Sequence, residues 1–127
     1  MLVIRNAQMS ALAAASEQDF RGRLETALRH HHAARLDALG PGGAEMLTDR
    51  AIAAARAHGM TWESSIAVLA GLMLDIGQEV HRHPRVAAVL ADSLLSPDSR
   101  VHALFERITA QEWNEIASTL PSATRTA

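Results

Sequence analysis

Cysteine, lysine and tyrosine are absent from this 127-residue sequence, which has only four aromatic residues. Without cysteine the chain has no disulfide framework, thiol nucleophile or thiolate metal ligand. All 12 basic residues are Arg and the formal net charge is −2. Because acidic and basic residues are interspersed, we expect no nucleic-acid partner, whose binding usually requires a basic stripe.

Long apolar runs are missing as well. The opening MLVIRNAQ becomes polar too early for a signal peptide, and no run of 18 apolar residues follows. We therefore expect a cytoplasmic protein that makes no contact with a membrane.

The residues that are abundant favour helices. Ala accounts for 25 positions, Leu is frequent, and almost no stretch alternates between apolar and polar residues as a strand would. The sequence predicts an all-α fold, with one domain over residues 1–120 and a disordered tail over 121–127. We expect a bundle of about five or six helices, the first of them long.

The first predicted helix covers about residues 7–39, with Asn6 as its N-cap and a kink near Ser16. The sequence LGPGG at 39–43 ends it, because these residues cannot continue a helix. The residues predicted to form its core-facing stripe are spaced mostly three or four apart. They are Met9, Leu12, Phe20, Leu24, Leu28 and His31.

Two further helices are predicted over residues 44–58 and 62–76. Gly59 suits the end of the first, and Thr61 is the expected N-cap of the second. The second is apolar on almost every side and should lie at the centre of the bundle. In the helix predicted over residues 44–58, the expected core positions are Met46, Leu47, Ile52 and Ala55.

The remaining helices are predicted mainly from the residues that start them. Pro84 suits the first turn of a short helix, and Ser96-Pro97-Asp98 provides a cap, a first-turn proline and an acid for the next. Thr109 and Glu112 have the spacing of a capping box before a last helix. The core positions expected in the fifth helix are Val101, Leu104, Phe105 and Ile108.

The sequence HHH at His30, His31 and His32 is the most unusual motif. Adjacent residues on a helix point about 100° apart, whereas metal-binding pairs on a helix prefer a spacing of four. We expect His31 to pack at the edge of the core, with its two neighbours solvated. No catalytic residue, cofactor or metal site is assigned.

A second histidine pair, His81 and His83, lies in a predicted loop, where extended residues two apart share a side. No third ligand is obvious in the sequence, so whether either group of histidines binds metal stays open. Asp75 and Glu79 near this loop are expected to be solvated acids.

Surfaces for a protein partner are better candidates than an active site. Trp62, at the start of the third helix, is a candidate interface residue, because Trp is enriched at binding hot spots. Trp is just as common as a core anchor, which is the alternative for this residue. Trp113 and Ile116 on the last helix are expected either to close the bundle or to contact a partner.

Several helix and turn patterns occur together in residues 3–107. They are IRNAQMSAL, Phe20 and Arg23, the turn at Leu39-Gly40, AIAAARAHGMTWESSIAVLAGLMLDIG, and HP…VLAD…LSPDSR. Through these patterns most of the chain resembles a group of small helical proteins that are encoded beside type VI secretion genes and PAAR-like spike or effector genes in Gram-negative bacteria. The resemblance does not rest on catalytic motifs.

The resemblance implies a non-enzymatic adaptor or chaperone that binds a secretion-system effector or spike component. An immunity protein that neutralises a cognate toxin is the alternative, and a histidine-based metal protein or enzyme is a third possibility. One departure stands out: similar proteins tend to have an aromatic residue and a proline after the first helix, where this chain has HHHAARL. Any function carried by that helix end does not transfer to this chain.

Overall fold

A computed structural model describes the backbone of residues 6–120 and the side chains of residues 15–120. This part of the chain forms six α-helices and one short 3₁₀ helix, with no strand, which confirms the predicted all-α fold. The tail predicted to be disordered, 121–127, lies outside the described residues. The elements in chain order are α1 (Asn6–Asp37), α2 (Gly43–Ala57), α3 (Glu63–Asp75), η1 (Val80–Arg82), α4 (Pro84–Leu90), α5 (Pro97–Arg107) and α6 (Ala110–Thr119).

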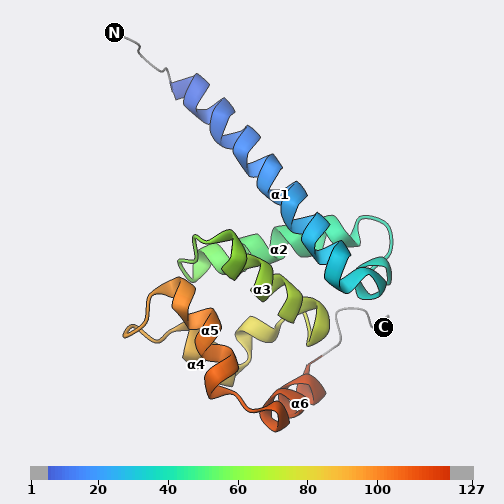
Figure 1. Cartoon of the computed structure of the whole chain (residues 1–127), viewed down its shortest axis with the longest axis vertical. Helices are drawn as coiled ribbons and strands as arrows, with labels where there is room; N and C mark the ends of the chain where they lie inside the picture. The colour runs from blue at the N-terminus through green and yellow to red at the C-terminus, as the bar shows by residue number, and fades with distance from the viewer. Residues whose placement is uncertain (1–5, 121–127) are drawn as a thin grey trace.

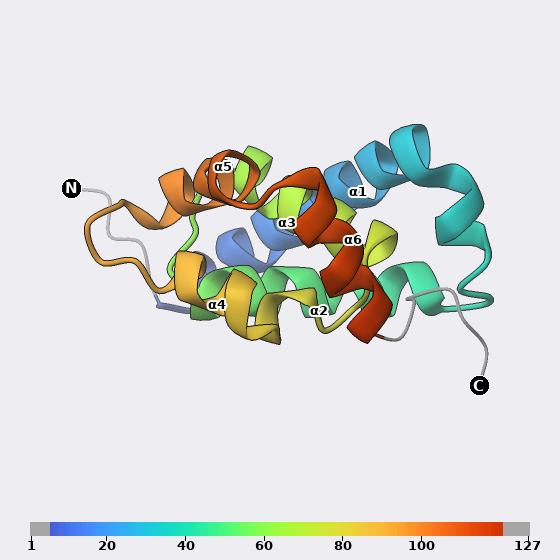
Figure 2. The same cartoon turned by 90° about the horizontal axis from the view of Figure 1, so that it is seen from below.

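The helices pack in two layers, and α3 lies at the centre of the packing. Figure 2 shows α1, α3 and α5 in one layer and α2 and α4 in the other, with α6 running from one layer to the other in front of them. α3 contacts α1, α2, α5 and η1, so the prediction that it is central is confirmed. The N-terminal part of α1 projects beyond the body of the molecule (Figure 1). In the described part of the chain, no helix is both long enough and apolar enough to cross a bilayer.

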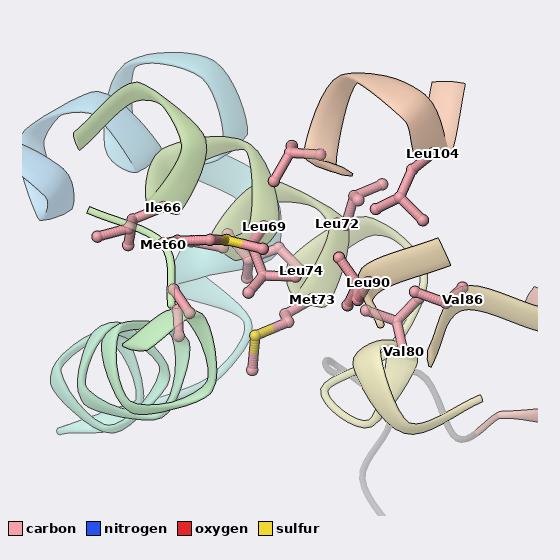
Figure 3. Close-up of a cluster of buried hydrophobic side chains, with 14 of the residues drawn as sticks. Met60, Ile66, Leu69, Leu72, Met73, Leu74, Val80, Val86, Leu90 and Leu104 are labelled. Carbon is pink, nitrogen blue, oxygen red and sulfur yellow. The ribbon is translucent and has the colours of Figure 1, made fainter. Parts of the chain in front are cut away.

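The core surrounds α3 because that helix is apolar on nearly all sides. Leu69 and Leu74 are fully buried, and Ile66 and Met73 are at most 2% exposed. Figure 3 shows the α3 side chains pointing in different directions, with Met73 between α2 and the turn of η1 and Leu72 toward Leu104 of α5. A helix that is apolar on every face is stable only where neighbouring helices cover all of its faces.

The long helix α1 follows its predicted stripe through Phe20, Leu24 and Leu28, which are all buried. The predicted kink near Ser16 is wrong, because the helix is continuous there. Its irregular residue is His32, with φ −137° and ψ 35°. The described part of the helix runs from Asn6, the residue predicted to be its N-cap, to Asp37, two residues before Leu39.

Turns and caps agree closely with the sequence predictions. The left-handed glycines Gly40 and Gly42 separate α1 from α2, and Gly59 ends α2 with φ +80°. The side chain of Ser96 accepts a hydrogen bond from Ser99 N at the start of α5. Thr109 and Glu112 form the reciprocal capping box of α6. The exception is α3, which is preceded by Trp62 in the N-cap position instead of the predicted Thr61.

Two predicted core residues are on the surface. Met46 is 58% exposed and Phe105 is 54% exposed. In α2 the buried face runs through Leu47, Thr48, Ala51, Ile52 and Ala55, and Met46 lies outside it. Thr48 is tolerated on this face because its hydroxyl donates to the carbonyl oxygen of Ala44 at 2.8 Å.

Candidate functional site

Trp62 is held at the start of α3 by a carboxylate from another helix. Its backbone N–H donates to Oδ1 of Asp98 at 2.9 Å, and the backbone N–H of Thr61 donates to the same atom at 3.2 Å. The Thr61 hydroxyl also donates, to Oδ2. Asp98 thus provides the side-chain cap that α3 lacks in its own sequence, while the Trp62 side chain remains 57% exposed.

Asp98 is itself buried, at 6% exposure. Burial raises the pKa of this carboxyl, but the hydrogen bonds from Trp62 and Thr61 outweigh that effect and hold the pKa below its usual value. The side chain is therefore a charged acceptor at neutral pH. The sequence predicted only that Asp98 would sit at the positive end of α5, and its contact with a helix start 36 residues earlier could not be read from local spacing.

A second exposed aromatic residue lies farther along α5. Phe105 follows Asp98 by seven residues, which is two helical turns and about 10 Å, so both leave the same side of α5. The ring of Phe105 lies 6.3 Å from the ring of Trp113 in α6, measured between centroids. Phe105 and the partly buried Trp113 are in contact, whereas Trp62 lies at the start of α3 and no contact joins it to them; the three residues together are called the aromatic surface below.

Ile116, the third predicted interface residue, is only 3% exposed. It packs in the core, so of the two alternatives for α6 this residue closes the bundle. Trp113, one turn earlier, is partly exposed beside Phe105. The guanidinium of Arg85 in α4 binds Glu112 with Nε 2.8 Å from Oε2 and holds the start of α6 in place.

The histidine triplet is arranged differently from the prediction. His31 is exposed and so is His30, whereas His32 is partly buried and faces α3. The prediction that His31 packs at the core edge is wrong, because the member of the triplet that contacts α3 is His32, the irregular residue of α1. The ring of His32 lies so close to Gly71 that a Cβ atom there would be 3.2 Å from its Nε2.

His81 and His83 do not form a pair on one side of an extended loop. His81 lies in the 3₁₀ turn η1, and Nδ1 of His83 accepts a hydrogen bond from Arg85 N as the N-cap of α4. Asp75, predicted to be a solvated acid, is 3.1 Å from Nδ1 of His32 and 3.6 Å from Nε of Arg35. In the described part of the chain, no three His, Asp or Glu side chains are placed to hold a metal ion.

The chain was compared with known protein families, curated proteins and solved structures, and none of them matches it.

Proposed function

We propose that this chain is a non-enzymatic helical adaptor or chaperone that binds a secretion-system effector or spike component, and that the aromatic surface is its contact site. The proposal is supported by the resemblance described above and by the placement of the aromatic residues. Of the four aromatic residues in the chain, only Phe20 is buried at 8% exposure. The other three form the aromatic surface.

Exposed aromatic rings are suited to binding because each offers a large apolar area at a small cost in side-chain entropy. A ring that is half exposed leaves roughly 100 Å² of apolar surface, and covering it is worth about 2–3 kcal/mol. Trp62 is attached to a fixed backbone, since Asp98 holds its N–H. A pre-ordered anchor of this kind loses little freedom when a partner binds.

The test is affinity capture of the tagged protein from its host cell, with mass spectrometry of the captured proteins. We expect a stoichiometric effector or spike component that is lost when Trp62→Ala and Phe105→Ser are combined. Leu94→Ser is the matched control, because Leu94 is 92% exposed and lies outside the aromatic surface. Capture that survives the double substitution, in a protein with unchanged thermal unfolding, would place the contact elsewhere and contradict the proposal.

The alternative, an immunity protein, differs in what it does to the captured partner. Co-expression of partner and wild-type chain separates the two roles. Rescue of cells from a toxic partner supports the immunity role, whereas a partner that is exported only when this chain is present supports the adaptor. Metal analysis of the tag-free protein examines the third possibility, a histidine-based metal protein.

A further inference from the structure

A groove of about 770 Å³ lies between α2 and η1 and includes no residue of the aromatic surface. Its volume is within the range of sites that bind small molecules. Side chains from α2, α3, η1 with its preceding loop, and α4 converge on it. A hollow of similar size lies along the surface of α1 alone, and a smaller one of about 400 Å³ beside Arg29 contains charges that already pair with each other.

One wall and the floor of the groove are apolar. Ala53, Ala54 and Ala57 form a stripe of small side chains along α2, and their size leaves the space open. The floor includes Met73, which is 1% exposed. Figure 3 shows its side chain directed between the end-on coil of α2 and the turn that carries Val80.

The charged residues of the groove, Arg50 on α2 and Glu79 with Arg82 around η1, carry a surplus of positive charge. Arg82 pairs with Glu79, with Nη1 3.2 Å from Oε2. Arg50 instead donates to the neutral amide oxygen of Gln78, and no carboxylate of the described residues lies within 4 Å of it. This positive site is a local departure from a chain whose net charge is −2.

Two histidines complete the lining. Burial lowers the pKa of His58, and the nearby Arg100 adds to the effect. Burial also lowers the pKa of His81, against the opposing effect of Glu79. The Nδ1 atom of His81 is buried without a hydrogen-bond partner. A neutral imidazole with an unpaired nitrogen can gain a hydrogen bond, and a proton, when an anion enters beside it.

We propose that the groove binds a small organic monoanion, with its carboxylate at Arg50 and an apolar body against Ala54, Ala57 and Met73. The planar guanidinium matches a carboxylate in shape and can donate two parallel hydrogen bonds to it. One unpaired positive charge matches one negative charge, and the alanine stripe excludes a strongly hydrated ligand. This site is independent of the proposed function.

The first experiment is an NMR titration of the full chain with benzoate, followed through backbone amide shifts at pH 7. We expect saturable shifts centred on Arg50, His58 and His81, with benzamide binding at least about tenfold more weakly because it lacks the charge. Shifts that do not saturate, or equal binding of benzamide, would overturn the proposal.

Substitutions then locate the site. Arg50→Gln should weaken benzoate binding about tenfold by removing the charged donor, and Ala57→Leu should do so by filling the groove without a change of charge. Arg23→Gln is the control, because Arg23 is also an exposed arginine but lies on α1 paired with Glu63. Unchanged binding in both groove variants, or an equal loss in the control, would show that benzoate binds elsewhere.

The pH dependence provides a separate test. The groups that face the groove are Arg50 and His58 from α2, Glu79, His81 and Arg82 around η1, and Arg100 from α5 next to His58. α3 and α4 contribute only Met73 and Ala87, which do not titrate. Between pH 7.5 and 6 benzoate stays ionised, and added charge on the histidines should tighten its binding about fivefold. Weaker binding at the lower pH would contradict the proposal.

Discussion

The Nδ1 atom of His32 lies 3.1 Å from Oδ1 of Asp75, which joins the irregular turn of α1 to the last residue of α3. The same imidazole covers Gly71, so the two helices approach closely at a position where α3 has no side chain. The histidine triplet thus has one member with a packing role and two exposed members. This arrangement, and three other features, give predictions that stability measurements can check.

The first prediction concerns His32 and Gly71. If nothing contacted its new Cβ, Gly71→Ala should raise the free energy of unfolding by about 0.5–1 kcal/mol, because Ala is the better helix former. With His32 present, the new Cβ meets its Nε2 at 3.2 Å and most of that gain should be lost. In a His32→Ala background the gain should return. A double-mutant cycle by urea unfolding measures this coupling, and strictly additive effects would show that the two residues do not touch.

The second prediction concerns the carboxylate that caps α3. Asp98→Asn should lower the free energy of unfolding by about 2 kcal/mol, because it removes a buried charged acceptor from the N–H groups of Thr61 and Trp62. Asp92→Asn is the comparison, since Asp92 pairs with Arg107 nearer the surface. A loss no larger for Asp98 than for Asp92 would contradict the role assigned to it.

Asp98 also predicts a response to acid. Its folded pKa is lowered by hydrogen bonds that outweigh the raising effect of burial, so its contribution is present above the ordinary value of 3.8. That contribution is lost as the pH falls through the lower folded pKa. The wild-type protein should therefore lose more stability below pH 3.8 than Asp98→Asn does. The free energy of unfolding of both proteins is measured against pH. A constant difference between the two curves below pH 3.8 would refute the prediction.

The third prediction concerns His58 and His81. Burial lowers the pKa of both below the ordinary value of 6.5, so the unfolded chain binds protons more readily than the folded one. Stability should fall as the pH drops through 6.5 toward the lower folded values. Replacing both residues by Gln should flatten this part of the profile. The free energy of unfolding measured across this range decides the matter.

The fourth prediction compares two glycines. Gly59 has φ +80°, and a Cβ there would lie 3.1 Å from Cγ of Pro97, so Gly59→Ala should cost about 1–2 kcal/mol or more. Gly22 lies inside α1 with nothing within 4 Å of its Cβ position. Gly22→Ala should therefore stabilise the protein by about 0.5–1 kcal/mol. Thermal unfolding should shift in opposite directions for the two variants.

The features that were predictable from the sequence are those set by neighbours along the chain. The glycine turn after α1, the proline and serine at the start of α5 and the capping box at Thr109 each depend on residues within four positions of one another. The apolar stripe of α1 and the central place of α3 follow from the helical period in the same way.

The errors arose where distant residues decide the geometry. Counting along a regular helix puts His31 on the core-facing stripe, but the histidine that contacts α3 is His32, through Asp75, and no local pattern indicates that contact. Phe105 continues the apolar spacing of α5, yet α6 covers only part of it. Asp98 was understood as a residue of its own helix, because no local pattern indicates that its partners are Thr61 and Trp62.

The shared carboxylate of Asp98 has a consequence for how the molecule opens. Because one side chain closes the start of α3 from within the first turn of α5, fraying of either helix start leaves groups of the other without partners. The two segments should therefore open together as one cooperative unit, and their amide hydrogens should exchange at similar rates. A partner protein that binds Trp62 should therefore also stabilise the start of α5, although α5 lies far from Trp62 along the chain.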